Sequence, residues 1–427
     1  MHNKNILTKE RIDSLREIRN KKREESFAAL IPAMGEEAVE EIRKIYSMFD
    51  ERMLVWMANL WEPNIGGFYY SNSARDHEGF LPDLESTHQA VIFITEQCGL
   101  VAKDQMHITA IPERFASKMA DFAYDLQDED GSFYHPQWGK NITATRKGRD
   151  AAAAWRLIEP LGRKCKYLRL SQRPKNEETK AALPEFLAST DTLLEWLEGQ
   201  RIEERSYQFG HYINSTTTNF FVAGQEYVDT LVAWLNSKNR ADNGLWEPQV
   251  NYSSVNGLMK LSLCYPGFGA KLPYPEKSYE SARAAVLSDE PLTFACEFYN
   301  AWAAVNNSIK SMDGEMAEAY REKLKQDAPE MIRVTGEKMA KCRVDDGSFA
   351  YFTAESGKTC PRSQGALVGL EDVREGDING NGCSTSAPLR HLFAAFGVEK
   401  PTMFTSEDAE LIFELMDNAV SPVKKPL

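Results

Sequence analysis

Residues 205–215, RSYQFGHYINS, place a cation, two tyrosines, a histidine and an asparagine within one short stretch. β-Elimination from a uronic acid needs a group that neutralises the sugar carboxylate. It also needs a base that removes the α-proton and an acid that protonates the leaving oxygen. Arg205 or Asn214 would hold the carboxylate, and His211 and Tyr212 would serve as base and acid. The alternative is a loop in which the histidine and the tyrosine only make structural hydrogen bonds.

A second polar stretch, residues 69–85, suggests a different chemistry. Its ionisable residues are Arg75, Asp76, His77, Glu78, Asp83 and Glu85, and its aromatic residues are Tyr69, Tyr70 and Phe80. Glycoside hydrolysis needs two carboxyl groups, and the four acids of this loop are the candidates, with Asp76 and Glu78 as the catalytic pair. Tyr70, Arg75 and Glu85 would then contact the substrate. Alternatively, Asp83 and Glu85 only stabilise the start of the next helix.

A third stretch supplies cations that suit an anionic ligand. Trp138 and Arg149 lie in or beside a loop at 134–149, and we predict that both bind substrate. Residues 156–175 add seven cations against one acid, Glu159. In an acidic protein this local excess would bind a uronic-acid glycan, although most charge runs are only solvated faces.

The bulk composition excludes several classes of function. The net charge of −13 argues against nucleic acid as the main partner. The seven cysteines are widely spaced, which is typical of reduced thiols in a cytoplasmic protein. The charged N-terminal stretch does not resemble a secretory signal, and no run of about 18 apolar residues occurs. We therefore expect a soluble cytoplasmic protein without a membrane partner, and the oligomeric state stays open.

Four glycine-containing turns organise the elements that must position these residues. They read NIGGFY at 64–69, DEDGSF at 128–133, ADNGLW at 241–246 and VDDGSF at 344–349. Each follows an amphipathic run and ends in an aromatic residue. Gly67, Gly131, Gly244 and Gly347 recur at one or two multiples of a unit of roughly 50–60 residues, as in repeat architectures. We predict that a helix ends at each glycine, in a left-handed conformation, and that the aromatic packs back on that helix.

Helical periodicity dominates the rest of the chain. We expect a charged N-terminal arm over 1–25 and one helical domain over 26–427. Ser86 and Gln89 have the spacing of a capping box at the start of one helix. The helical patterns cover about 26–60, 113–127, 149–160, 184–200, 218–237, 276–286, 291–306, 313–342, 386–396 and 406–417. Loops expected at the site are 69–85, 134–149, 205–217, 247–257, 265–276 and 350–384.

The repeated helix and DDGSF-type turn resembles the α/α-toroid proteins. These include terpenoid cyclases, protein prenyltransferases, six-hairpin glycosidases and toroid polysaccharide lyases. The resemblance implies an all-α toroid of about six hairpins, with short β-ribbons at the turns and the site at one mouth. Because such folds host unrelated chemistries, the resemblance does not choose among them.

We expect neither a cofactor nor a metal. The stretch Asp377–Gly382 begins like a calcium-binding EF-hand loop, but Pro388 occupies the position of its bidentate glutamate, which favours a plain Asn-Gly turn. The spacing of Asp377, Cys383 and His391 also differs from the zinc ligands of prenyltransferases.

The leading hypothesis is a carbohydrate-active enzyme acting on acidic oligosaccharides, by β-elimination or by hydrolysis, with a preference for elimination. The alternatives are a terpenoid-cyclase-like or prenyltransferase-like protein with an apolar cavity, and a non-catalytic toroid that binds a glycan or a protein.

Overall fold

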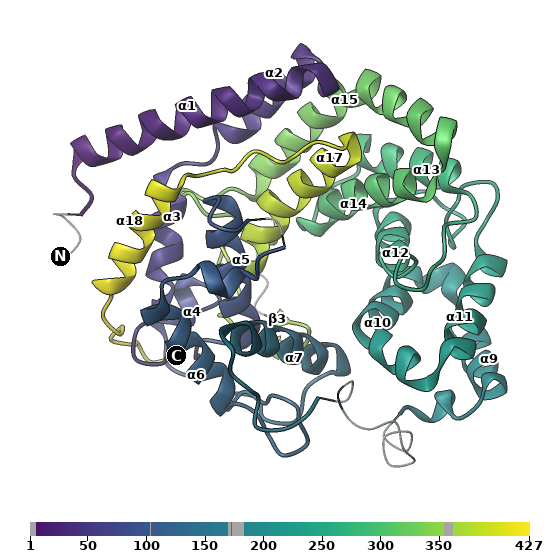
Figure 1. Cartoon of the computed structure of the whole chain (residues 1–427), viewed down its shortest axis with the longest axis horizontal. Helices are drawn as coiled ribbons and strands as arrows, with labels where there is room; N and C mark the ends of the chain where they lie inside the picture. Colours follow the sequence, from purple (N-terminus) through teal and green to yellow (C-terminus); the bar gives the residue numbers. More distant parts are fainter. Residues whose placement is uncertain (1–5, 103, 170–171, 173–182, 354–361) are drawn as a thin grey trace.

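The computed structural model describes residues 6–102, 104–169, 172, 183–353 and 362–427 (Figure 1). The described chain is predominantly helical, which confirms the expected all-α class. The α-helices are α1 (Lys9–Met34), α2 (Glu36–Tyr46), α3 (Glu51–Asn59), α4 (Asn72–Asp76), α5 (Leu84–Gln97), α6 (Glu113–Asp125), α7 (Ala144–Ile158), α9 (Thr190–Glu198), α10 (Ile202–Ala223), α11 (Gln225–Lys238), α12 (Tyr252–Ser262), α13 (Pro275–Leu287), α14 (Cys296–Ser311), α15 (Gly314–Cys342), α16 (Ile378–Asn381), α17 (Ala387–Phe396) and α18 (Ser406–Asp417).

Short elements complete the description. The 3-10 helices are η2 (His107–Ala110), η3 (Glu159–Leu161) and η5 (Glu185–Leu187), and η6 (Gly382–Ser386) is a π-helical turn. Strands β1 (Trp61–Glu62) and β2 (Gly67–Phe68) form one antiparallel hairpin, and β3 (Arg362–Ser363) and β4 (Ala366–Leu367) form another. The first hairpin lies at a glycine turn, as expected for the ribbons.

Six helices contact one another around a closed path, which we call the contact ring. Helix α5 contacts α7, α7 contacts α10, α10 contacts α12, α12 contacts α14, and α14 contacts α17. The turn η6, immediately before α17, contacts α5 and closes the path. In Figure 1 the blue helices α5 and α7 lie across from the green helices α12 and α14. Other helices pack behind the ring: α6 on α7, α11 on α10, and α13 and α15 on α14.

The turn glycines adopt the predicted left-handed backbone with one exception, but the helices end five to seven residues before them, at Asn59, Asp125, Lys238 and Cys342. Gly131, Gly244 and Gly347 have positive φ angles of 80°, 68° and 85°, but in the first turn Gly66 (φ 85°), not Gly67, adopts this conformation. A Cβ on Gly244 would lie 2.3 Å from the Ser278 amide nitrogen of α13, so this turn packs directly on a neighbouring helix.

The aromatic residue after each turn is fully buried, as the sequence predicts. These residues are Phe68, Phe133, Trp246 and Phe349. The Trp246 indole nitrogen donates a hydrogen bond to the Leu235 carbonyl, in the helix that precedes its turn. The turn glycines and these rings therefore fix how consecutive helices pack.

Several loops expected from the sequence are wholly or partly helical; α4 lies inside 69–85, and α7 begins at Ala144, inside 134–149. The stretch 205–217 lies inside α10, and α12 begins at Tyr252, within the expected loop 247–257. Ser206, Phe209, Gly210 and Ile213 are buried at helical spacing in α10. Polar residues between them hid this period, because a helix packed on several sides lacks one clear apolar face. The pattern at 218–237 spans two helices that meet at Gly224.

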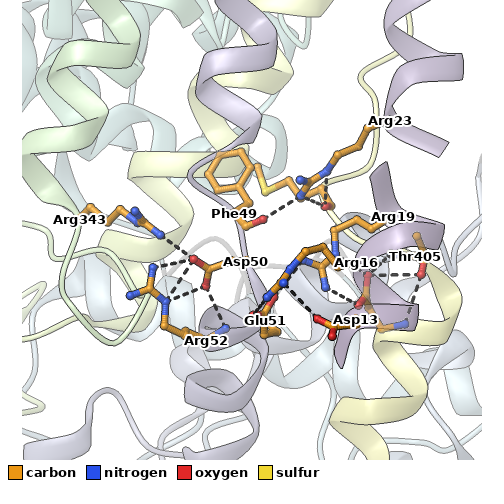
Figure 2. A network of polar contacts seen from close by, with 12 residues as sticks. Asp13, Arg16, Arg19, Arg23, Phe49, Asp50, Glu51, Arg52, Arg343 and Thr405 are labelled. Carbon is orange, nitrogen blue, oxygen red and sulfur yellow. Dashed lines mark hydrogen bonds and ion pairs between the residues drawn. The ribbon is translucent and has the colours of Figure 1, made fainter. Parts of the chain in front are cut away.

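The N-terminal helix α1 buries one face, including charged residues, against the other helices, and it continues to Met34. Arg19 and Arg23 are buried. The Arg19 guanidinium donates to both Asp408 carboxylate oxygens at 2.9 and 3.1 Å, and Arg23 donates to the Phe49 carbonyl at 3.0 Å (Figure 2). Helix α1 therefore joins α18 to the start of α3.

Two further local expectations are wrong. Asp83, not Ser86, caps α5: its carboxylate accepts a hydrogen bond from the Ser86 amide at 3.0 Å. Asp377 likewise caps α16 by accepting from the Gly380 amide, so this stretch is a helix start and not an Asn-Gly turn. None of the described helices has the length and apolarity that a membrane span requires.

Candidate functional site

Helix α10 carries the centre of the candidate site. Tyr207 and His211 are four residues apart, and one face of a helix therefore presents both. Their rings stack with centroids 6.0 Å apart and an interplanar angle of 25°. The His211 Nε2 atom is 2.8 Å from the Gln364 amide oxygen, between strands β3 and β4. Both α10 side chains are half-buried, and the His211 Nδ1 atom is buried without a hydrogen-bond partner among the described residues.

Two cations from neighbouring ring helices act on this pair. Arg149 comes from α7 and Lys260 from α12, on either side of α10. Gly210 allows α10 to approach α12, since a Cβ there would lie 2.8 Å from the Lys260 Cβ. Burial, then Lys260 and Arg149, lower the pKa of His211 to about 4. The imidazole is therefore neutral at pH 7 and can accept a proton.

The same environment shifts the pKa values of the other titratable groups in the direction that favours their neutral forms. Burial raises the pKa of Tyr207, so its phenol stays protonated. Burial also lowers the pKa of Lys260, and the nearby Arg149 charge lowers it further. At pH 7 the Tyr207–His211 pair therefore holds a neutral imidazole that can accept a proton and a protonated phenol that can donate one, although both pKa shifts make these transfers harder than for the free side chains.

Residues of α14, η6 and the loop after α15 complete the cluster. The Tyr351 hydroxyl donates a hydrogen bond to the Cys296 sulfur at 3.2 Å. Burial raises the pKa of Cys296 and of Tyr299 to about 12. Cys383 lies in the π-helical turn η6, a type of element that is frequent at functional sites. The thiols and phenols here are neutral, so Arg149 and Lys260 supply the charge.

Glu85 positions Arg149 through a buried ionic hub. One Glu85 carboxylate oxygen pairs with Arg149, and the other accepts hydrogen bonds from Arg146 at 3.1 Å and from Ser363 at 2.7 Å. Arg146 is fully buried and also donates to Asp83 at 2.8 Å and to Asp150 at 3.0 Å. Although burial favours the neutral acid, the two arginines hold the pKa of Glu85 below its usual value. This hub joins α5, α7 and the β3–β4 hairpin.

The structure brings three of the expected site residues together: His211, Arg149 and Glu85, with Glu85 in a supporting position. Most residues expected from the loop 69–85 lie elsewhere. Asp76 pairs with Arg75 at 2.7 Å, and its carbonyl accepts a hydrogen bond from the Lys425 amide. The Glu78 amide donates to the Lys425 carbonyl, and its side chain is exposed. The C-terminal tail therefore lies along this loop.

Tyr70 and Trp138 are used in packing. Tyr70 is buried in a small apolar cluster with Ala366 and Val368, against which Trp138 packs. Trp138 stacks on His135 with centroids 4.1 Å apart, and the Arg146 guanidinium lies over its ring. Tyr70 is therefore buried beneath the hub, whereas Trp138 packs against the hub and stays half-buried.

The remaining expected residues lie on other faces of α10. Arg205 and Tyr212 line a separate pocket with Trp196 and Phe209. Asn214 is exposed, and its amide nitrogen lies 3.7 Å from the Cys264 sulfur. The structure therefore separates His211 from Tyr212, because adjacent helical residues point about 100° apart.

Three cations of the basic stretch 156–175 pair with acids, two of them with acids of α6. Arg163 pairs with Asp121 of α6, Lys166 lies 3.8 Å from Asp125, and Arg169 lies 3.5 Å from Glu159. Arg173 and Lys175 fall outside the described residues. Charge counting along the sequence overlooks such pairs.

Several site residues escaped the sequence analysis, namely Tyr207, Lys260, Cys296, Tyr299, Tyr351, Gln364 and Cys383. A helical assignment for 205–215 would have paired Tyr207 with His211 through their spacing of four. Lys260 and Cys296 carry no local signal, since only the packing of α12 and α14 brings them close.

Among the described residues no group of three or more histidine, cysteine, aspartate or glutamate side chains has the geometry to hold a metal ion. Comparison with known proteins found no matching family model, no matching curated protein and no matching solved structure.

Proposed function

We propose that this chain is an α/α toroid of six helical hairpins and a carbohydrate-active enzyme that cleaves uronic-acid-containing oligosaccharides by β-elimination. The closed path of contacts through α5, α7, α10, α12, α14 and α17 supports the toroid. Unpaired cysteines, including Cys98, Cys264 and Cys342, support a reducing compartment such as the cytoplasm.

One observation carries the chemical proposal. The Tyr207–His211 pair lies under the influence of two cations, Arg149 and Lys260, contributed by the two flanking ring helices. A uronate carboxylate would bind these cations, which neutralise its charge and acidify the adjacent C5–H bond. Charge-assisted contacts of this kind are about twice as strong as neutral hydrogen bonds.

The proposed reaction uses the two α10 side chains in opposite senses. Neutral His211 accepts the C5 proton, and the C5–H electron pair forms the C4–C5 double bond. The bond from C4 to the glycosidic oxygen breaks, and the Tyr207 phenol donates its proton to that oxygen. Tyr207 thus takes the acid role that the sequence analysis gave to Tyr212.

Hydrolysis fits the geometry less well, because Glu85 and Asp83 are committed to Arg146 and the other carboxylates of the 69–85 loop lie by the C-terminal tail. A terpenoid cyclase would need an apolar cavity, whereas the cluster here is cationic. A binding-only protein would not need an acid paired with a base.

The test is an ultraviolet assay for the unsaturated uronate product, on a panel of polyuronides and glycosaminoglycan oligosaccharides. We expect product with the native protein, and a loss of about 10²–10⁴-fold in rate for His211→Ala and for Tyr207→Phe. Arg149→Gln should mainly raise KM. Tyr320→Phe, on α15 and outside the cluster, is the matched control and should keep at least a third of the activity.

Absence of product from every substrate would reject β-elimination. A Tyr320→Phe variant as inactive as Tyr207→Phe would remove the assignment of the acid. Release of reducing ends without ultraviolet absorbance would instead indicate a hydrolase.

A further inference from the structure

A pocket of about 430 Å³ lies between α9 and the first turns of α10, which we call the α9–α10 pocket. Its lining residues on α10 are Arg205, Gln208, Phe209 and Tyr212, at spacings of three and four. That spacing defines a helix face different from the one that carries Tyr207 and His211. The pocket is therefore separate from the proposed catalytic cluster.

Aromatic rings form the body of this pocket. Trp196 of α9 stacks on Phe186 with centroids 4.0 Å apart and an interplanar angle of 10°. The Tyr212 and Phe209 rings lie 5.7 and 5.9 Å from Trp196. Trp196 and Tyr212 are only half-buried, which leaves rigid apolar surface for a ligand. An aromatic wall with a few polar groups is typical of small-molecule sites.

The polar groups at the rim are two cations, Arg201 and Arg205, and two amides. Arg205 is exposed and makes no ion pair or side-chain hydrogen bond with any residue that the structure describes, whereas the neighbouring Arg201 pairs with Glu204. The Gln200 amide nitrogen donates to the Trp196 carbonyl at 2.8 Å, which leaves its oxygen as an acceptor. The Gln208 side chain is exposed.

Backbone strain coincides with this rim. Arg201 has a φ of 50°, in the left-handed region that a residue with a Cβ rarely adopts. Arg205 marks a kink in α10, with non-helical φ and ψ, and its amide donates to the Arg201 carbonyl at 3.1 Å. Strained residues cluster at ligand-binding sites, because surrounding structure must hold them in place.

We propose that the α9–α10 pocket is a non-catalytic binding site for one sugar unit of an acidic oligosaccharide. The Arg205 guanidinium binds the uronate carboxylate, the Trp196 and Tyr212 rings contact the apolar face of the sugar, and the Gln200 and Gln208 amides bond its hydroxyls. No bond is broken at this site, and the choice of an acidic oligosaccharide as its ligand rests on the proposed function. The site would add affinity for longer chains beyond what the catalytic cluster provides.

Isothermal titration calorimetry with tetragalacturonate tests this proposal in the full-length Tyr207→Phe protein, which should not consume the ligand. We expect two classes of site, and Arg205→Gln should weaken one of them by at least about tenfold, since a charge-assisted contact is lost. Gln208→Glu, an exposed substitution that adds a repelling charge, should weaken the same class. Arg333→Gln removes an exposed cation of α15, a helix that packs on α2, α13 and α14, and should change neither.

Fully methyl-esterified tetragalacturonate, which lacks the charge, should not occupy the Arg205-dependent site. The proposal is overturned if Arg205→Gln and Gln208→Glu both bind tetragalacturonate as the unsubstituted protein does, or if the ester binds equally well. Arg205-dependent binding without any elimination product would reject the proposed function and keep this site. Product formation without Arg205-dependent binding would do the reverse.

Discussion

Two stretches of this chain, 69–85 and 205–215, are similarly rich in ionisable and aromatic residues, yet folding uses them differently. In the first stretch, Asp83 and Glu85 are bonded to Arg146, and Asp76 is paired with Arg75. In the second, Arg205 remains unpaired within the described chain, and His211 bonds only to Gln364 through Nε2. The carboxylates of the first stretch find cationic and backbone partners, whereas Arg205 and the half-buried His211 of the second have few.

The largest expected effect follows from removing Arg146, the α7 cation that binds Asp83 and Glu85 of the first stretch. Arg146→Met leaves the buried Asp83, Glu85 and Asp150 carboxylates without their shared partner. We expect the free energy of unfolding to fall by about 3–5 kcal/mol, as when one member of a buried ion pair is lost. Chemical denaturation monitored by circular dichroism measures the change.

His211→Gln is the matched substitution in the second region. We expect it to change the free energy of unfolding by less than about 1 kcal/mol, because His211 makes one bond and is only half-buried. If both variants lost the same stability, the contrast between a structural and a functional region would be wrong.

Asp150, which binds Arg146 beside the first stretch, and His211 in the second should make contributions to stability that depend on pH with opposite signs. Burial raises the pKa of Asp150 from 3.8 to about 7, against the opposing effect of Arg146. The folded state then binds more protons than the unfolded state between these values, so this contribution to stability is lost as pH rises from about 4 to 7. His211, with its pKa lowered from 6.5 to about 4, contributes stability that is lost as pH falls from 6.5 to 4.

Urea midpoints at pH 4, 5.5 and 7.5 separate the two contributions. Asp150→Asn should remove the decline in stability toward pH 7.5, and His211→Gln should reduce the decline toward pH 4. If the Asp150→Asn protein had the same dependence of urea midpoint on pH as the unsubstituted protein, Asp150 would be ionised over the whole range from pH 4 to 7.5. The acid limb of activity should accordingly lie near pH 4, well below the usual histidine value.

Local signals sufficed for much of the fold but for less of the site. The turns at Gly131, Gly244 and Gly347 were predictable because left-handed backbone and a following aromatic are encoded in a few adjacent residues. The site depends on contacts between helices distant in sequence, such as α12 with α10. No spacing within one segment reveals that Lys260 acts on His211.

The misplaced helix boundaries had a specific cost. Interpreting 205–217 as a loop made Tyr212 the natural partner of His211, because neighbours in a loop can converge. In a helix the partner is four residues away, and Tyr207 occupies that position. A polar helix in the middle of a helical protein lacks a simple apolar stripe, and its chemistry is then easily assigned to the wrong face.

The smallest effect is expected from the basic stretch 156–175, whose cations resemble Arg205 in sequence but not in their partners. Arg163 pairs with Asp121 at the surface. A second nitrogen of its guanidinium donates a hydrogen bond to the Ser117 carbonyl. Arg163→Gln should cost no more than about 1 kcal/mol, as exposed pairs do. Because Asp121 already neutralises this cation, tetragalacturonate affinity should change less than twofold, against at least tenfold for Arg205→Gln. Equal losses in the two variants would mean that diffuse positive charge, and not a formed pocket, attracts the acidic oligosaccharide.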